Sequence, residues 1–561
     1  MIRARRSLIA LVALLAIVLA ACGSSGGSKS APKTSSTTGF GAAPSGTIVV
    51  GAEQDAACAD WIDKCAASSW GAWMMQYQTM PRVFDYAKQG SDWVEVPNVA
   101  MAGMPTVTDV GGKQTVTYKI SDAAIWSDGE PITSNDIKYT ATQLTSGKNV
   151  YDPTGYDQIE SVATPDPKTA VVTFKKPFAS WTQLFSADYG IQPSHLLEGK
   201  NRDQLMKNGY SWSGGPWIAK WNKGVSVTLT PNPKFYGTKP TVQKVIFKIL
   251  ADTAAQFQAF KAGELLAIYP QPEPSAIAAI KGGVPGTQAV YTADTANLEA
   301  VWMNNSRAPF DNKVVRQAVA YSIDRNAIVK RLFGDIGVEK PMQNLQPPIN
   351  SRFADPNAWS QYTLNLDKVN SLMTGDGWKK DGSGVWAKGG KTASFTIEST
   401  AGNKRRELTE QILQQELQQA GFKMTIANKS ADDLFGKILG AGTYQMTIYA
   451  QTATSLNPGL CAVACTSAIP TKANGQSGNN LSRISVPAAD PLLATVDSNP
   501  DVQARITAGK QADRLLGDDQ VSIPLDPLPN IVLWSDRIGG PVADNPVLSM
   551  FWNMNLWTLK G

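Results

Sequence analysis

The chain has 561 residues and a formal net charge of +5, from 52 Lys and Arg against 47 Asp and Glu. That length exceeds one ordinary hydrophobic core and suffices for two or three domains. The near-neutral balance, without a Lys/Arg stripe or a nucleic-acid-binding motif, excludes DNA and RNA as partners.

The first 22 residues have the layout of a secretory signal. Three arginines in Met1–Arg6 precede the apolar run Ser7–Leu19, which is too short and wrongly flanked for a stable membrane span. Leu19-Ala20-Ala21-Cys22 then places small residues directly before a cysteine and resembles a bacterial lipobox. The resemblance implies that residues 1–21 are a lipoprotein signal peptide and that Cys22 carries the lipid. The alternative is an ordinary signal for a secreted soluble protein.

A flexible tether is predicted next, over residues 22–45. This segment consists mostly of Gly, Ser, Thr, Ala, Pro and Lys, and it cannot bury enough apolar surface to offset chain entropy. From Thr47 the composition is that of a folded chain, and no later apolar run approaches the roughly 20 residues that cross a bilayer. We therefore expect a folded body held at the outer face of the cytoplasmic membrane by its lipid alone.

Four further cysteines form two local pairs, Cys58 with Cys65 and Cys461 with Cys465. An exported chain meets an oxidising environment, so two short-range disulfides are the simplest pairing. Zinc is the alternative, but Cys58 and Cys65 are too far apart in sequence for a zinc knuckle.

The body alternates strand and helix patterns without an internal repeat. Thr133 and Ser134 supply oxygen atoms to cap a helix over Asn135–Leu144, and Gly263 ends a helix over Ala254–Ala262. Strands are predicted where β-branched residues run or alternate, over Thr115–Ile120, Ala170–Phe174, Ser226–Thr230, Val242–Leu250 and Glu299–Asn304.

In the second half of the chain the pattern becomes helix, glycine, strand. Asp311 and Asp324 are predicted to cap two successive helices. A third helix, Glu407–Ala420, has an apolar face and stops at Gly421, after which Phe422–Ile426 returns as a strand. This succession favours an α/β fold built in layers.

Several short motifs carry a family resemblance. They are Trp126-Ser127-Asp128-Gly129-Glu130-Pro131-Ile132-Thr133, then Gly214-Gly215-Pro216-Trp217, then Asn232-Pro233-Lys234-Phe235-Tyr236-Gly237, then Pro309-Phe310-Asp311 with Val315-Arg316-Gln317-Ala318-Val319 and Ile323-Asp324-Arg325. In this order they resemble the family 5 extracellular solute-binding proteins, the peptide, opine and nickel receptors of ABC importers. Each motif is weak alone, but their number and order behind a lipobox make a strong match over residues 46–561.

The resemblance implies a two-lobe α/β fold, periplasmic-binding-protein-like and of type II, in which the chain crosses between the lobes twice. Lobe I would comprise residues 46–303 and 522–561, with an extra subdomain near 70–205, and lobe II residues 304–521. The implied function is that of a lipid-anchored, monomeric receptor. It would capture a small solute, an oligopeptide or a related compound, in the cleft between the lobes and deliver it to the permease subunits of an ABC importer.

An exported serine hydrolase is the alternative from another class of protein. His195 is the only histidine, and catalytic triads assemble from residues distant in sequence. The segment Gln192–Leu197 around it, however, resembles a structural element of the family, so we favour a receptor without turnover. We expect no metal or other cofactor, since Walker-type glycine loops are absent and one histidine offers few nitrogen ligands for nickel.

Ligand contacts are expected where strands end. The candidates combine aromatic faces, amides and one carboxylate, a mixture that suits variable solutes: Glu53, Gln54, Trp302, Asn304, Tyr449 and Gln451. Packing or hinge support is the alternative role of each, and Asn304 is the preferred hinge residue.

One departure from the family concerns the ligand's charge. Peptide receptors of this family usually carry an aspartate a few positions after an aromatic residue, where it pairs with the peptide ammonium group. Here the segment from Tyr449 to Leu456 contains no acid. Either Glu53 or Asp55 replaces it, or the ligand lacks a free amine. A peptide, an opine, a sugar and another solute all remain open.

Overall fold

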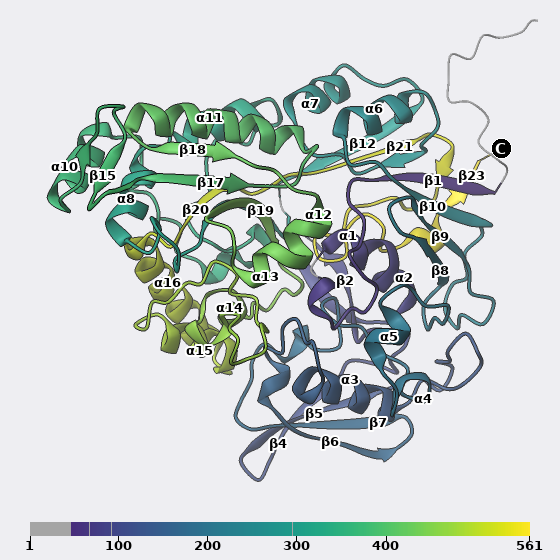
Figure 1. Ribbon diagram of the computed structural model, residues 1–561. Coiled ribbons are helices and arrows are strands. Elements are labelled where there is room, and N and C mark those ends of the chain that lie inside the picture. Colours follow the sequence, from purple (N-terminus) through teal and green to yellow (C-terminus); the bar gives the residue numbers. More distant parts are fainter. Residues whose placement is uncertain (1–45, 67, 91, 294, 561) are drawn as a thin grey trace, which may run out of the picture. The chain divides into compact units, whose positions relative to one another are not determined.

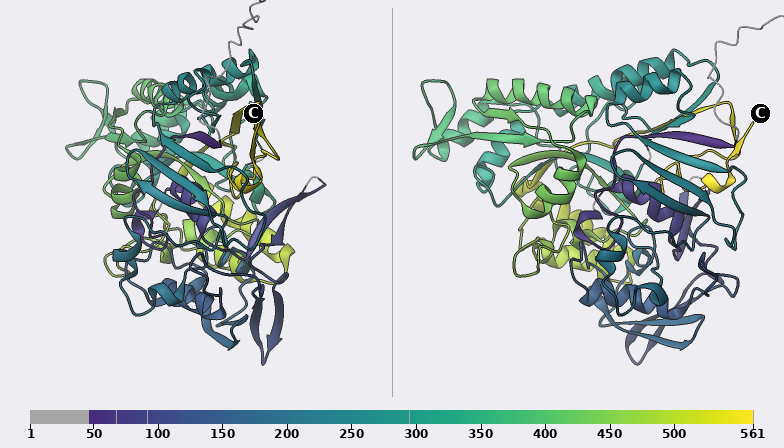
Figure 2. Two further views of the ribbon diagram at one scale, coloured as in Figure 1. Left: turned by 90° about the vertical axis from the view of Figure 1, so that its right-hand side faces the viewer. Right: turned by 45° about the vertical axis from the view of Figure 1, so that its right-hand side comes forward.

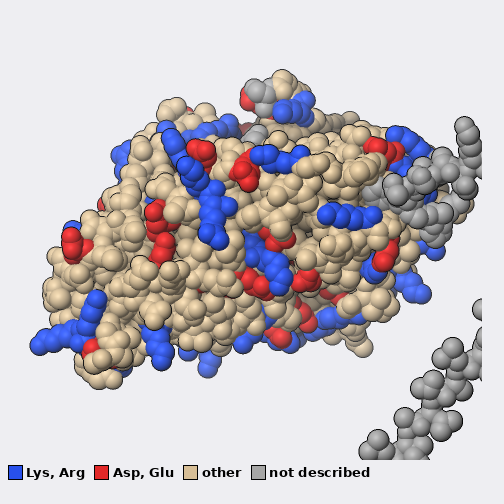
Figure 3. Space-filling view, turned by 90° about the horizontal axis from the view of Figure 1, so that it is seen from above, with Lys and Arg blue, Asp and Glu red and all other residues tan. Residues whose placement is uncertain are grey.

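The computed structural model describes residues 46–66, 68–90, 92–293 and 295–560 (Figure 1). The predicted signal peptide, the lipidation site Cys22 and the tether lie outside these residues. No helix in the described part is both long and apolar enough to cross a membrane. On the face seen in Figure 3, Lys and Arg side chains are interspersed with Asp and Glu, and no basic stripe forms there.

The largest sheet has seven strands and mixed topology. In spatial order they are β12 (Thr287–Thr292), β21 (Asn530–Ser535), β11 (Ala267–Ile268), β1 (Thr47–Ala52), β10 (Lys244–Ile249), β9 (Ser226–Pro231) and β8 (Trp217–Asn222). β1 runs parallel to both β10 and β11, so the carboxyl ends of these three strands lie at one edge. In α/β sheets that edge is where ligand sites form.

A second sheet has five strands and is built from the later part of the chain. In spatial order they are β18 (Lys423–Ile426), β17 (Ser394–Glu398), β19 (Met446–Thr452), β13 (Asn297–Met303) and β20 (Ser522–Asp526). β13 is buried along its whole length because it is hydrogen-bonded on both sides, to β19 and to β20. Most of its side chains are apolar, as suits that central position, but Asn297 and Glu299 are buried there too.

A four-stranded antiparallel sheet lies apart from the two larger ones (Figure 2). It consists of β4 (Thr106–Val110), β5 (Lys113–Lys119), β7 (Thr169–Phe174) and β6 (Ile159–Asp166), and α3 (Ser134–Ser146) packs on it. The small sheets are β2 (Phe84–Gln89) with β3 (Asp92–Pro97), β14 (Lys379–Lys380) with β15 (Trp386–Lys388) and β16 (Lys391–Thr392), and β22 (Ile538–Gly539) with β23 (Thr558–Leu559).

The remaining helices connect and cover these sheets, and α11 packs on β18 (Figure 1). The longer ones are α6 (Thr253–Lys261), α7 (Pro274–Lys281), α8 (Lys313–Tyr321), α9 (Arg325–Phe333), α10 (Leu366–Gly375), α11 (Lys404–Ala420), α15 (Asp490–Ser498) and α16 (Val502–Asp519). The short ones are α1 (Ser69–Gly71), α2 (Tyr77–Thr79), α4 (Ser194–Leu197), α5 (Arg202–Met206), α12 (Ala431–Asp433), α13 (Leu439–Ala441) and α14 (Leu460–Ala464).

Buried apolar side chains form two clusters. One surrounds the five-stranded sheet and includes Val301, Val319 and Ile448. The other joins the seven-stranded sheet to the four-stranded one and includes Val50 and Trp126. Two separate cores agree with the expectation from chain length that one core would not suffice.

Most predicted helix starts are found, with one correction. Asp136 accepts a hydrogen bond from the backbone N–H of Thr133 at 2.9 Å, as the helix prediction requires, and Asp324 accepts from Ala327 N–H at 3.0 Å to cap α9. The predicted cap Asp311 is wrong. Asn312 caps α8 instead, because its Oδ1 lies 2.8 Å from the N–H of Val314.

Sheet membership bears on the predicted lobe boundaries. With boundaries at residues 303 and 522, β13 and β20 belong to lobe I, but both strands hydrogen-bond within the five-stranded sheet. The chain therefore passes between the two large sheets once between β12 and β13 and again between β20 and β21. These connections touch, since the Thr295 hydroxyl donates to the Leu528 carbonyl at 3.1 Å.

The two predicted disulfides, Cys58–Cys65 and Cys461–Cys465, are confirmed. Each closes a short loop, with sequence separations of 7 and 4. Both pairs are consumed by sulfur–sulfur bonds, which leaves no thiolate among these four for zinc.

Replacing Cys58 and Cys65 together by Ser should lower the free energy of unfolding by about 2 kcal/mol, the loop-closure entropy of so short a loop. Urea unfolding of the parent and the variant without reductant measures this difference in the free energy of unfolding. The parent protein in dithiothreitol is the comparison, and its urea midpoint should fall at least as far, because the reductant also opens Cys461–Cys465. An unchanged midpoint in both would contradict the assignment of a stabilising bridge.

Candidate ligand cavity

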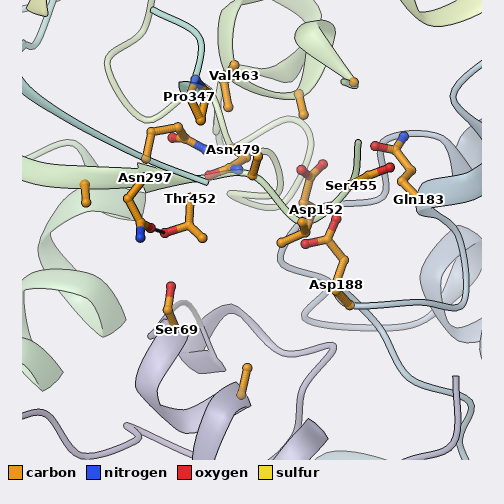
Figure 4. Close-up of a pocket in the computed structure, with 18 of the residues that line it drawn as sticks. Ser69, Asp152, Gln183, Asp188, Asn297, Pro347, Thr452, Ser455, Val463 and Asn479 are labelled. Atoms are coloured by element: carbon orange, nitrogen blue, oxygen red, sulfur yellow. Dashed lines mark hydrogen bonds between the residues drawn. The ribbon is translucent and has the colours of Figure 1, made fainter. Parts of the chain in front are cut away.

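A cavity of about 280 Å³ opens among segments from both large sheets and from the residues that precede and follow the four-stranded sheet. This volume is near the lower end for small-molecule sites, roughly 300 Å³. Figure 4 shows its walls: Ser69 on one side, Asn297 and Thr452 on another, and Asp152, Asp188 and Gln183 on a third. Residues more than 300 positions apart in sequence therefore face one space.

Aromatic rings make up much of the wall. Trp73 lies 5.4 Å from Trp70 between ring centroids and meets Tyr269 edge-on at 5.6 Å. Tyr449 lies on another wall and stacks on Trp302 at 5.1 Å, with an angle of 20° between the rings. Rings held by other rings cannot turn freely, so they present fixed apolar faces to a ligand.

Three of the six predicted contact residues line this cavity. Gln54, Tyr449 and Gln451 do so, from the ends of β1 and β19. Among the described residues, the side chain of Gln451 has no hydrogen-bond partner, and it is half-buried. Contact between these residues and a ligand stays a prediction.

The other three candidates are not among the residues that line the cavity. Trp302 packs beneath Tyr449 and donates its indole N–H to the Tyr449 carbonyl at 2.9 Å. The Asn304 amide donates to the carbonyls of Gly442 and Tyr444, at 3.1 and 3.0 Å. Glu53 is 3 % exposed. Polar and aromatic residues at a strand end can either support the fold or contact a ligand, and the sequence pattern is the same in both cases. The pattern alone therefore could not tell these three residues from ligand contacts.

The two carboxylates suggested for a ligand amine are both occupied by the protein. Glu53 accepts hydrogen bonds from the amides of Gln271 and Asn403. Asp55 accepts from the Trp221 indole at 2.8 Å and from the Gly224 backbone. Neither is left open to the cavity by these contacts.

A buried ion cluster stands next to the cavity. Glu299, which is fully buried, accepts from Arg406 at 2.6 and 3.0 Å and pairs with Arg405 at 2.9 Å. Burial raises the pKa of Glu299, but the charges of both arginines outweigh it and hold this pKa at about 2. Arg406 is the only basic residue that lines the cavity in the described part of the chain, and its third nitrogen donates to Thr400 at 2.9 Å.

Two acidic residues of the cavity were missed by the sequence analysis. Asp152 lies in the loop between α3 and the 3₁₀ turn Tyr156–Gln158, and Asp188 in the loop after the 3₁₀ turn Trp181–Gln183. Burial raises the pKa of each to about 6. No periodicity or motif marks either residue in the sequence. Only a list of all acidic residues in loops would have included them as candidates.

The surroundings of His195 do not favour a hydrolase. Its Nε2 lies 2.9 Å from Asp128, and the neighbouring Ser194 hydroxyl donates to Asp136 at 2.6 Å. Asp136 also receives the Trp126 indole N–H at 3.2 Å. These contacts tie one turn to the start of α3, and His195 has no hydrogen bond to a serine among the described residues.

Comparison with known proteins places this architecture. The family described as bacterial extracellular solute-binding proteins, family 5 Middle, matches residues 96–461, and the chain belongs to this family. A protein of Brucella ovis described as an ABC transporter peptide-binding protein is 32 % identical over 276 residues. That alignment covers 47 % of this chain and 50 % of the relative, so the chain matches about half the length of the Brucella proteins.

Two longer alignments have lower identity. Protein XP55 of Streptomyces lividans is 22 % identical over 473 residues, covering 82 % of this chain and 81 % of XP55. The oligopeptide-binding protein OppA of Mycobacterium bovis is 24 % identical over 472 residues, covering 82 % of this chain and 76 % of OppA.

Solved structures confirm the predicted fold class. The oligopeptide-binding protein AppA of Bacillus subtilis, solved with a nonapeptide, superposes with a TM-score of 0.80 at 18 % identity, covering 92 % of this chain and 99 % of AppA. NikZ of Campylobacter jejuni, solved with Ni(L-His), gives 0.78 at 20 % identity, covering 92 % and 100 %. The chain thus has the α/β fold of periplasmic binding proteins.

Replacing Glu299 by Gln should lower the free energy of unfolding by about 3–5 kcal/mol at pH 7, because two buried arginines lose their anion. Since the pKa of Glu299 is lowered in the folded state from 4.5 to about 2, its stabilisation is present above pH 4.5 and disappears as pH falls towards 2. Urea unfolding of parent and variant between pH 7 and pH 2 measures the difference.

Glu264→Gln is the control for this comparison. Glu264 pairs with Lys248 at 3.2 Å on the surface, and its loss should cost less than about 1 kcal/mol at any pH. Equal effects of the two substitutions would show that the buried cluster does not stabilise the fold.

Proposed function

We propose that this protein is an extracytoplasmic receptor that binds a small, oligopeptide-like solute in the cavity and hands it to the membrane subunits of an ABC importer. Family membership supports the receptor role, and the printed descriptions of the Brucella and Mycobacterium relatives support a peptide. The observation that carries the proposal is the cavity itself, whose rings and amides come from both large sheets.

Binding works in this proposal through closure of two lobes. Lobe I would contain the seven-stranded and four-stranded sheets and lobe II the five-stranded one. The hinge would lie where the chain passes between the two large sheets, around Thr295 and Leu528. Asn304, the sequence-based hinge candidate, stands at the opposite end of β13 from the nearer connection. A solute shifts the open–closed equilibrium only as far as it binds the closed form better.

A ligand-stripped sample should be stabilised by its solute, by about 2.7 kcal/mol at 100 times the dissociation constant. Thermal unfolding against a panel of di- to pentapeptides, opines and sugars measures this, with mass analysis of co-purified compounds alongside. A flat response from every class, with nothing bound after purification, would refute the receptor role.

Gln451→Ala tests whether the cavity is the site. Losing one amide contact should weaken binding of a hit by about 5-fold, near 1 kcal/mol, while leaving the unliganded melting temperature unchanged. Gln418→Ala, an exposed position on α11, is the matched control. Equal affinities of the two variants would place the ligand elsewhere.

The lipid anchor belongs to the same proposal. It rests on the Leu19-Ala20-Ala21-Cys22 sequence, and the receptor would act as a monomer beside its importer at the outer face of the cytoplasmic membrane. Changing Cys22 to Ala should release the protein from washed membranes of an expressing bacterium. Retention of the Cys22→Ala protein in the membrane fraction would refute the lipobox interpretation.

A further inference from the structure

We infer that the ligand of this cavity carries a cationic nitrogen, an ammonium or guanidinium group, which binds between the carboxylates of Asp152 and Asp188. The inference rests on the proposed function and narrows it, because it assigns the ligand's charge and the residues that recognise it. The acid that family peptide receptors carry after Tyr449 is absent, and neither Glu53 nor Asp55 is open to take its place.

The two carboxylates share one side of the cavity. Figure 4 shows both side chains reaching from neighbouring loops towards the open space. The negative charge of Asp152 contributes to the raised pKa of Asp188. They are the only acidic residues that line the cavity in the described ranges. Two like charges in one partly enclosed space repel each other, and a cation placed between them removes that penalty.

The protein supplies no counterion to this pair. Asp152 is balanced only by contacts with Thr154 and Asp188 only by the Thr454 side chain, and no salt bridge reaches either in the described part of the chain. Arg406 does line the cavity, but Glu299 and Thr400 occupy its nitrogens. At a pH above their pKa of about 6, the two carboxylates therefore carry negative charges that no cation in the described part of the chain neutralises.

Aromatic residues flank the pair in a way that suits a cation. Tyr151 and Tyr189 both line the cavity, and each is adjacent in sequence to one of the acids. The Tyr189 hydroxyl is fixed by the Asp152 backbone, donating to its carbonyl at 2.9 Å, and the Tyr151 hydroxyl donates to Asn479 at 2.7 Å. These hydrogen bonds hold both rings in the cavity wall, and aromatic rings attract nitrogen cations.

A second, independent feature also calls for a ligand with N–H donors. Asn350 lines the cavity and is 3 % exposed, and its side-chain carbonyl has no hydrogen-bond partner among the described residues. The buried hydroxyl of Ser68, also in the lining, lacks one too. Unpaired buried acceptors are costly, so they point to a partner brought by the solute.

The test measures affinities by calorimetry for a panel that varies only the cation. Ac-Ala-Gln-Ala-NH2 has none, Ala-Gln-Ala-NH2 has the terminal ammonium, and Ac-Ala-Lys-Ala-NH2 has a side-chain ammonium. 1,4-Diaminobutane is the non-peptide source of the same chemistry. We expect at least one cationic probe to bind the parent protein about 10-fold or more tighter than the neutral peptide. The probe that binds most tightly shows whether the cation is a peptide's terminal ammonium, a side-chain ammonium or a non-peptide amine.

Asp152→Asn and Asp188→Asn should each reduce this preference to about 3-fold or less, mainly by weakening the cationic probe. Asp335→Asn, at an exposed position, is the control and should keep the full preference. Because each substitution removes a repulsive charge from the empty cavity, both variants should melt at or above the temperature of the parent at pH 7.5. A variant that melts much lower is replaced by the Glu substitution, which keeps the charge and should keep the preference.

Each outcome separates the inference from the proposed function. Tight binding of neutral and cationic peptides alike would overturn the inference and leave a peptide receptor. Binding of the diamine alone, lost in both Asn variants, would support the inference and overturn the peptide class. A preference that survives both Asn variants but disappears in Glu53→Gln would show that the cation site was misplaced. No binding by any of these probes would overturn the inference, whereas the receptor role stands or falls with the thermal-unfolding panel.

Discussion

The buried ion cluster of Glu299 with Arg405 and Arg406 is the interaction on which the rest of the structure depends. Glu299 lies on the central strand β13, and both arginines lie in the first turn of α11, so the cluster locks that helix to the five-stranded sheet. Asn403, which caps α11, reaches Glu53 at the end of β1, in the other large sheet. A charge group this deep is tolerated only because every member is paired.

This cluster also decides the charge of the cavity. Arg406 faces the cavity but is neutralised by Glu299, and so it offers little to an anionic ligand. The loops around the four-stranded sheet bring Asp152 and Asp188 to another wall without any such partner. Arg406 is therefore neutralised by Glu299, whereas Asp152 and Asp188 have no cationic partner among the described residues. In our inference, that asymmetry would give a solute a preferred orientation.

Stability and recognition compete in this arrangement. Burial disfavours all of these charges. In the Glu299 cluster the opposite charges of Arg405 and Arg406 outweigh that cost, whereas no cation offsets it for the carboxylates of Asp152 and Asp188 in the described part of the chain. The aromatic walls around Trp73 and Tyr449 are held by neighbouring rings and do not depend on a ligand for their positions. The cavity thus combines rigid apolar faces with a polar edge of two unpaired carboxylates, and in our inference a cation bound at that edge would recover the most free energy.

The sequence by itself determined the family, the α/β class, both disulfides and most helix starts, because caps, glycine stops and short cysteine spacings act over a few residues. Thr133 with Asp136 and Asp324 are examples, while Asn312 in place of Asp311 shows the one-residue uncertainty of such signals. Tertiary structure alone decided that β13 and β20 belong to the five-stranded sheet and that Glu53 is occupied. It also decided that Asp152 and Asp188 face the same cavity. Strand pairing and the neutralisation of a charge depend on partners hundreds of residues away, and no local pattern records them.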